Sequence, residues 1–123
     1  MKSFLLVFLG GGLGSGLRYL VASAMNQYSK VLPFGTFTVD MLGCLLIGMI
    51  LAYAQKENTL TSNQILLLAT GFCGGFTTFS AFANENLELI KNGEIFNFSI
   101  YTICSILVGV LAVFIGYYTV MNK

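Results

Sequence analysis

The sequence contains no histidine and no tryptophan, and it has only one proline. Without histidine the chain has no imidazole base and no histidine-ligated metal. Its three cysteines, Cys44, Cys73 and Cys104, lie far apart in apolar runs, which does not indicate a disulfide framework or a zinc site. We expect all three to be small, buried packing residues. The net charge of +1 gives no reason to expect a nucleic-acid partner.

Charge is also scarce, and it is unevenly placed. Charged residues make up 9% of the chain and hydrophobic residues 56%, whereas soluble domains carry about 25% charged residues. The stretches 4–17, 41–55 and 95–121 contain no charge at all. A helix needs about 20 mostly apolar residues to cross a bilayer, and with their flanks these stretches reach that length. The composition therefore predicts an integral membrane protein.

Four membrane spans can be assigned, at 4–24, 34–54, 63–90 and 96–119. Short polar connectors join them at 26–32, 55–61 and 91–94, which leaves no room for a soluble domain. Pro33 precedes the second span, where proline suits a helix start, and Thr61 or Ser62 is placed to cap the third. The sequence thus predicts an all-α fold, with residues 1–123 forming a single four-span membrane domain.

Lysine and arginine are almost evenly divided between the two predicted faces of the membrane. An even number of spans puts both termini on one side, together with Lys2, Lys56 and Lys123, while Lys30 and Lys91 lie on the other and Arg18 leans toward them. Because positive charge orients membrane proteins, a chain this balanced can insert in both directions. That balance permits an antiparallel homodimer. A weakly oriented monomer is the alternative.

The third span carries a run near its middle that favours a break, Gly71-Phe72-Cys73-Gly74-Gly75-Phe76-Thr77-Thr78. Glycine is unfavourable inside a helix by about 1 kcal/mol relative to alanine, and two β-branched threonines follow. A break frees backbone groups that must be buried in protein or line a cavity, and freed carbonyls are a ready cation site. Alternatively, Gly71 and Gly75 form a surface for close helix packing, and both interpretations can hold together.

Beyond this run, Phe79 and Phe82 are three residues apart and share a helix face, which Glu85 continues. Phenylalanines on a membrane helix usually pack or face lipid. A phenyl ring nonetheless has a positive edge, and edges turned into a narrow pore can coordinate a small anion.

The first span holds two pairs of glycines four residues apart, Gly10 with Gly14 and Gly12 with Gly16. Small residues at this spacing favour close helix approach. The glycine-rich stretch is not a nucleotide-binding loop, because no Gly-Lys-Ser/Thr follows it.

Three ionisable residues, Arg18, Asp40 and Glu85, fall within or at the ends of spans. A charge at the bilayer centre costs about 3 kcal/mol on insertion scales, so such groups are usually paired or functional. The alternative is that Arg18 reaches an interface and that Glu85 and Glu88 lie near the end of their helix. Asp40 lies about two turns into the second span and is harder to explain in that way.

Taken together, these segments resemble the CrcB/Fluc family of fluoride channels over the whole chain. The matching segments are the glycine-rich first span ending in Arg18-Tyr19, then Pro33-Phe34-Gly35-Thr36 leading into Val39-Asp40-Met41-Leu42-Gly43, and finally the run from Gly71 to Phe82 with Glu85 after it. The last run is the most specific.

The resemblance implies an antiparallel, dual-topology homodimer of four-helix subunits with two pores at the subunit interface. The implied function is passive, selective export of cytoplasmic fluoride, which protects the cell from its toxicity. Such a protein is a channel and not an enzyme, and it lies in the bacterial plasma (inner) membrane as a multi-pass protein. Its partners would be fluoride, a second copy of the chain and the lipid bilayer.

The resemblance also assigns residues. Phe79 and Phe82 would line the fluoride path with their ring edges, and Arg18 would lie near a water-filled vestibule. The main-chain carbonyls of Gly74 and Thr77, from both subunits, would hold one structural Na⁺ on the two-fold axis. The remaining implied fluoride-binding residues are Thr36, Asp40, Ser80, Tyr101 and Ser105, of which the last two begin a polar track on the fourth span.

This sequence departs from the family pattern at Asp40, where the family has asparagine. An amide can donate a hydrogen bond to an anion, whereas an ionised carboxylate only accepts and repels it, and a protonated acid could donate. Gly109 and Val113 on the fourth span, and Ala81 on the third, occupy positions where the resemblance leads us to expect hydroxyl side chains.

Two other functions are weighed against the channel. A proton-coupled small multidrug-type exporter is also a compact four-span, dual-topology dimer. That class needs a carboxylate in its first span, which this chain lacks, so Asp40 would have to substitute. The other alternative is a non-conducting partner subunit of a heterodimeric channel, which the departures from the family pattern keep open.

Overall fold

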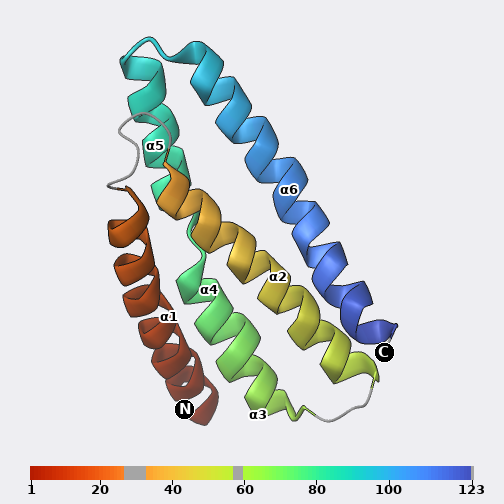
Figure 1. The fold of residues 1–123 in the computed structure, drawn as a ribbon. Coiled ribbons are helices and arrows are strands. Elements are labelled where there is room, and N and C mark those ends of the chain that lie inside the picture. The colour runs from red at the N-terminus through yellow and green to blue at the C-terminus, as the bar shows by residue number, and fades with distance from the viewer. Residues whose placement is uncertain (27–32, 57–59, 123) are drawn as a thin grey trace.

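A computed structural model describes residues 1–26, 33–56 and 60–122, and every regular element in this part of the chain is a helix. Four helical segments are long and apolar enough to cross a membrane: Lys2–Met25, Phe34–Lys56, Ser62–Lys91 and Ile95–Met121. They confirm the four predicted spans, with edges at most a few residues beyond those predicted. Both termini lie at the same end of the molecule, as an even number of spans requires (Figure 1).

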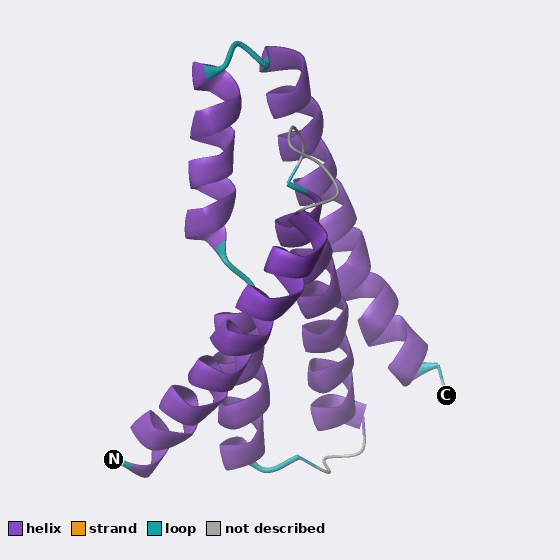
Figure 2. Cartoon of the chain, turned by 60° about the vertical axis from the view of Figure 1, so that its left-hand side comes forward, coloured by secondary structure: helices purple, strands orange, loops and turns teal. Residues whose placement is uncertain are grey.

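Three spans are continuous helices and the third is not. The continuous ones are α1 (Lys2–Asn26), α2 (Phe34–Lys56) and α6 (Ile95–Met121). The third span consists of α3 (Ser62–Ile65), the π-helical segment η1 (Leu66–Cys73), α4 (Gly74–Phe76) and, after a short non-helical link, α5 (Phe79–Lys91). This link is visible between the two parts of the third span in Figure 2.

The helix ends follow the local sequence signals. Pro33 immediately precedes α2, and Thr61 caps α3 in a reciprocal arrangement with Gln64. The Gln64 amide donates to the Thr61 hydroxyl at 3.2 Å, and the Thr61 amide donates to the Gln64 side chain at 2.9 Å. Gly93, with φ of 77°, makes the turn between α5 and α6. Most of the predicted connector at 26–32, with Lys30, and also Lys123 lie outside the described residues.

The two halves of the third span pack against different helices. The half made of η1 and α4 packs on α1, whereas α5 packs on α6, and α2 packs along α6 and also contacts α1 and η1 (Figure 1). The break therefore lies where the third span changes neighbours.

Glycines bring α1 and the first half of the third span into backbone contact. A Cβ at Gly14 would collide with the carbonyl oxygen of Phe72, and one at Gly75 would collide with that of Gly11. The predicted close approach is thus confirmed for Gly10 and Gly14, and so is the packing interpretation of Gly71 and Gly75. It is wrong for Gly12 and Gly16 within the subunit, because a Cβ at either would meet nothing within 4 Å.

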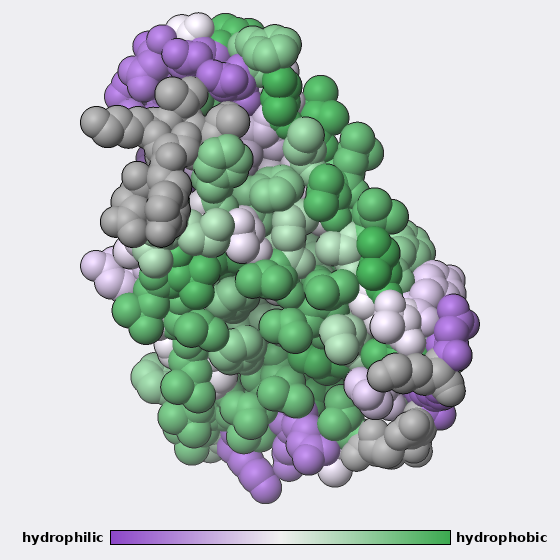
Figure 3. All heavy atoms as spheres, viewed as in Figure 1, coloured by the Kyte–Doolittle hydropathy of each residue, from purple (hydrophilic) through white to green (hydrophobic). Residues whose placement is uncertain are grey.

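The outer surface is apolar over most of its length, with polar residues gathered at the two ends (Figure 3). Large side chains such as Phe8, Leu13 and Leu107 are exposed, as contact with lipid requires. The expected burial of all three cysteines is wrong for Cys104, which is exposed on α6, while Cys73 is buried and Cys44 is half-buried. An unbranched thiol side chain is apolar enough to face lipid.

Candidate functional site

The third span breaks at its two threonines. Thr77 (φ −86°, ψ 157°) and Thr78 (φ −150°, ψ 124°) are extended, whereas Gly74 (φ −62°, ψ −38°) is still helical. The predicted break is therefore confirmed, but its position is at the end of the glycine run. The glycines serve close packing, and the β-branched threonines, which favour extended backbone, take the non-helical positions.

Side chains satisfy the amides that the break releases. The Thr78 amide donates to Asp40 Oδ1 at 3.0 Å, and the Ala81 amide donates to Thr78 Oγ1 at 3.2 Å, which caps α5. In a continuous α-helix these two amides would donate to the carbonyls of Gly74 and Thr77. Both carbonyls have therefore lost their regular helical donors.

The carbonyl of Gly75, which lies between Gly74 and Thr77 in the sequence, accepts hydrogen bonds from two side chains of α1. Arg18 Nε donates to it at 3.1 Å and Ser15 Oγ at 3.3 Å. Arg18 thus lies across the third span, just before the break. A charge-assisted hydrogen bond to a carbonyl is stronger than a neutral one, so this contact fixes α4 against α1.

A cavity of about 460 Å³ lies beside the break. It is lined from α2, η1, α4, α5 and α6, and the predicted site residues among its walls are Asp40, Gly74, Thr77, Phe79, Phe82 and Ser105. Four other predicted residues, Arg18, Thr36, Ser80 and Tyr101, are not on its walls. The fold thus brings the predicted cation ligands and the predicted pore rings to one cavity.

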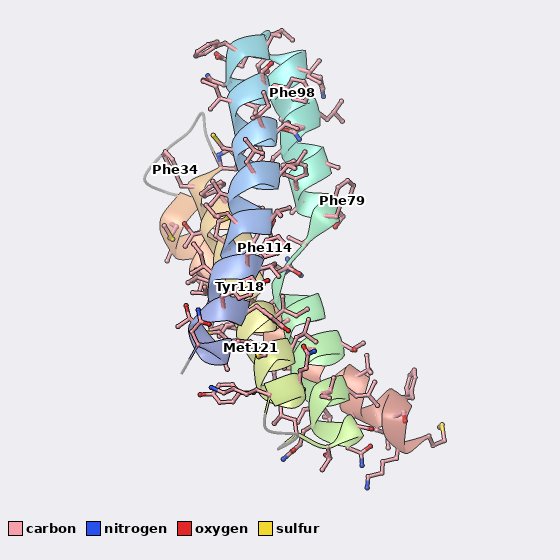
Figure 4. The ribbon with its side chains drawn as sticks, turned by 90° about the vertical axis from the view of Figure 1, so that its right-hand side faces the viewer. Phe34, Phe79, Phe98, Phe114, Tyr118 and Met121 are labelled. Atoms are coloured by element: carbon pink, nitrogen blue, oxygen red, sulfur yellow. The ribbon has the colours of Figure 1, made fainter. Side chains whose placement is uncertain are left out.

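Three aromatic rings form a series that leads from this cavity to α6. The ring centroids of Phe79 and Phe82 are 5.8 Å apart with planes tilted by 49°, and those of Phe82 and Tyr101 are 5.1 Å apart, tilted by 47°. Phe79 is 79% exposed, and it projects outward at the start of α5 (Figure 4). Tilted rings present edges as well as faces to their surroundings.

Glu85 joins three helices beyond the last ring. Its carboxylate accepts a hydrogen bond from Thr36 Oγ1 of α2 at 2.7 Å and another from the Tyr101 hydroxyl of α6 at 2.9 Å. Two of the four predicted hydroxyl residues, Thr36 and Tyr101, therefore direct their hydrogens at Glu85. Sequence analysis placed Glu85 on the face of the two phenylalanines but did not include it among the site residues, although the three-residue spacing from Phe82 was a usable signal.

The two predicted serines differ in their surroundings. Ser105 Oγ is buried on the cavity wall and makes no hydrogen bond to any of the described residues. Ser80 Oγ is exposed and lies 3.2 Å from Thr78 Oγ1. Ser105, a residue of the cavity wall, thus has a buried hydroxyl without a partner among the described residues, whereas Ser80 shares its hydroxyl with the cap of α5.

Two residues on the cavity wall were not predicted as site residues. Cys44 and Cys73 both line it, and Cys44 Sγ would be 3.7 Å from a Cβ built on Gly109. The space beside Gly109, where a hydroxyl side chain was expected, therefore borders a thiol from α2. The sequence contained no signal for this, because 65 positions separate the two residues along the chain.

Comparison with known proteins gives a family match over almost the whole chain. Residues 5–117 match the family described as CrcB-like protein, Camphor Resistance (CrcB). A protein of Flavobacterium psychrophilum named fluoride-specific ion channel FluC is 42% identical, with 94% of each chain covered. Proteins of the same name from Phocaeicola vulgatus (49% identical, 94% of this chain and 96% of the relative) and Gloeothece citriformis (48%, 98% of each) are similar to the same extent.

Proposed function

This chain belongs to the CrcB family of multi-pass membrane proteins, and we propose that it is a fluoride-specific ion channel that passively exports fluoride from the cytoplasm. The observation that carries the proposed path is the series of tilted rings of Phe79, Phe82 and Tyr101, which begins at the cavity beside the break. The named relatives, all called fluoride-specific ion channels, support the choice of ion.

Fluoride is small and strongly hydrated, so a pore must replace the water that the ion loses. The ring edges of Phe79 and Phe82 supply positive charge without a formal charge, which holds an anion weakly enough for it to leave. Ser105, whose buried hydroxyl has no partner among the described residues, supplies a hydrogen-bond donor at the cavity wall. Ser80 lies beside Phe79 and supplies another. Pore width and donor placement then select against the larger chloride ion.

Thr36 and Tyr101 act through Glu85 in this arrangement. Each donates to one oxygen of that carboxylate, so neither hydroxyl hydrogen is directed at the cavity. The cluster fixes the position of the Tyr101 ring, which is the last of the three. Arg18, anchored on the Gly75 carbonyl through Nε, has further N–H groups that attract anions to a vestibule.

A second, antiparallel copy completes the channel. Halfway along the third span the chain exposes Ser80, the backbone of Gly74 and the ring of Phe79. Non-helical backbone at membrane depth must be covered by protein or line a water-filled cavity, and a partner subunit supplies that cover. The sequence assigns Lys2, Lys56 and Lys123 to one side and Lys30 and Lys91 to the other, with Arg18 leaning toward the second side, and this near balance suits insertion in both directions. Residues 1–123 act as one four-span domain in each subunit.

A structural Na⁺ fits the residues at the break. Backbone carbonyls at interruptions in membrane helices are suitable Na⁺ ligands. The carbonyls of Gly74 and Thr77 have lost their helical donors and belong to residues on the cavity wall. One chain offers two such oxygens, and a two-fold partner doubles that number. The cation would hold the two broken spans together at the dimer interface.

The test is fluoride efflux from liposomes that contain the purified protein. A potassium gradient with valinomycin provides the driving force, and a fluoride electrode outside follows release. We expect fast, uncoupled fluoride release and exclusion of chloride. Transport that needs a proton gradient and accepts organic cations would instead identify an exporter, and no flux from pure protein would identify a partner subunit of a heterodimer.

Cross-linking in liposomes tests the dimer separately. Ser80 is exposed beside the break that the partner is proposed to cover, so a cysteine introduced there, in a protein whose exposed Cys104 is replaced by alanine, is placed to link the two copies. The proposal expects a band of twice the subunit mass and equal labelling of each terminus from both sides of the membrane. A protein that stays monomeric contradicts it.

A further inference from the structure

The face of α2 that meets the break holds both threonines, each by a different contact. The Thr78 amide donates to Asp40, and the methyl group of Thr77 lies where a Cβ on Gly43 would be, so an alanine there would collide with it. Asp40 and Gly43 are three residues apart and share a helix face. Both residues of the break therefore contact the same face of α2, at Asp40 and Gly43.

The Thr78 amide has two possible acceptors. If the third span were one continuous helix, this amide would donate to the Gly74 carbonyl. In the structure it donates to Asp40 Oδ1. A carboxylate is the stronger acceptor because the hydrogen bond is charge-assisted, so it favours the broken form over the continuous one.

We propose that Asp40 is the positioning residue that keeps the third span broken and so leaves the Gly74 carbonyl free to bind a cation. This inference rests on the proposed Na⁺ site and adds the residue that forms it. Asp40 acts through the Thr78 amide, and no direct contact with the cation is required.

Charges on both sides of the break fit this role. Arg18 attracts Asp40 electrostatically and itself donates to the Gly75 carbonyl. Arg18 thus donates to the Gly75 carbonyl before the break, while Asp40 accepts from the Thr78 amide within it. These two backbone groups, the Gly75 carbonyl and the Thr78 amide, are each hydrogen-bonded to a side chain of opposite charge, which satisfies them within the protein. Among the described residues, the other ionisable groups that interact electrostatically with Asp40 are Glu85, Tyr101 and Cys44.

The experiment compares Asp40→Asn with Asp40→Ala in the purified full-length protein. The asparagine keeps an acceptor oxygen in reach of Thr78 but removes the charge, whereas alanine removes both. Thermal unfolding is followed while Na⁺ replaces N-methylglucamine, and the midpoint of the stabilisation gives an apparent Na⁺ affinity. Thr38→Ala, on the same helix, is the control and is expected to match the unmodified protein.

We expect Asp40→Ala to lower the apparent Na⁺ affinity about tenfold or more, and Asp40→Asn to fall between it and the unmodified protein. Should Asp40→Ala not fold, Asp40→Asn alone carries the test, because an Na⁺ affinity equal to that of the unmodified protein would show that the charge on the acceptor has no role. Unchanged affinity in Asp40→Ala would overturn the inference. Equal losses in the asparagine and alanine variants would also overturn it, since charge alone would then explain them.

Failure of the inference can be told apart from failure of the proposed function. If the unmodified protein shows no response to Na⁺ but conducts fluoride, the cation site and this inference fail and the channel stands. If it shows the expected Na⁺ series but conducts no fluoride, the channel proposal fails and the role of Asp40 stands.

Discussion

The two halves of the third span, joined end to end, are held in place by different physical means. Before the break, η1 and α4 lie backbone to backbone against α1, and the contact depends on the absence of side chains at Gly71 and Gly75. After the break, α5 is held by side-chain chemistry, through Glu85 to α2 and α6 and through the ring contacts of Phe82. The first half is therefore a fixed support, and the second carries the rings that we propose line the fluoride path.

The different contacts of the two halves explain why the third span breaks. The glycine half is stabilised by close packing on α1 and by the hydrogen bonds of Arg18 and Ser15 to the Gly75 carbonyl, and it stays helical to its last glycine. The aromatic half turns the ring of Phe82 and the carboxylate of Glu85 toward α6. The two extended threonines between them let each half adopt the orientation its own contacts demand, with Arg18 and Asp40 satisfying the backbone.

The largest expected effect comes from filling the packed half. Gly14→Val places side-chain atoms where the Phe72 carbonyl lies, and overpacking of this kind costs about 3 kcal/mol. We expect a large loss of folded dimer, measured by size-exclusion chromatography and thermal unfolding. Gly12→Val, where a Cβ meets nothing within 4 Å, is the matched control within the subunit. Normal folding of Gly14→Val would show that close packing against α1 does not hold the first half of the third span in place.

Removing the carboxylate of the second half should have the next largest effect. Glu85→Ala leaves the hydroxyls of Thr36 and Tyr101 without their acceptor, and each unsatisfied group costs about 1–3 kcal/mol. We expect strongly reduced fluoride flux and lower thermal stability. Glu88→Ala breaks only an exposed pair with Lys91 at 3.8 Å and should change neither measurement. Equal effects at the two positions would show that the buried cluster has no special role.

The rings themselves come next. Phe79→Ile and Phe82→Ile each retain bulk but lose the positive ring edge, and edge contacts of this kind are worth about 1 kcal/mol, or severalfold in rate. We expect reduced fluoride flux in liposomes with unchanged folding. Phe96→Ile, at an exposed position at the start of α6, is the control. Unchanged flux in both pore variants would exclude the rings from the mechanism.

A smaller effect, of opposite sign, is expected at Asp40. Asp40→Asn removes a negative charge from the cavity wall while keeping an acceptor for the Thr78 amide. An amide also donates hydrogen bonds to anions, so fluoride flux near neutral pH should be preserved or increased. A complete loss of flux in this variant would show that the carboxylate has a required role in conduction.

The smallest effect is expected at Gly109. A Cβ there would lie 3.5 Å from Met41 Cε and 3.7 Å from Cys44 Sγ, which are ordinary contacts, so Gly109→Ser should fold normally. Its hydroxyl adds a donor beside the cavity, and we expect a modest rise in fluoride flux. Gly116→Ser is the matched contrast on α6, because its Cβ would collide with the Leu45 carbonyl and destabilise the fold.

Much of the site was predictable from sequence, for reasons tied to spacing. Residues three apart on one helix share a face, so Phe79, Phe82 and Glu85 could be placed together before the structure was known. The break could be predicted from glycine and threonine propensities, but its position within the run could not. Propensity does not distinguish a glycine that breaks a helix from one that permits close packing, and at Gly75 the carbonyl of Gly11 decides it.

By itself the sequence determined the membrane class, the four spans and the face of the third span that carries the rings, because hydropathy and helical periodicity are local properties of the chain. Tertiary structure alone decided that Asp40 meets the Thr78 amide, that Arg18 and Ser15 hold the Gly75 carbonyl, and that Thr36 and Tyr101 converge on Glu85. These contacts join different spans, and which spans become neighbours depends on how whole helices pack.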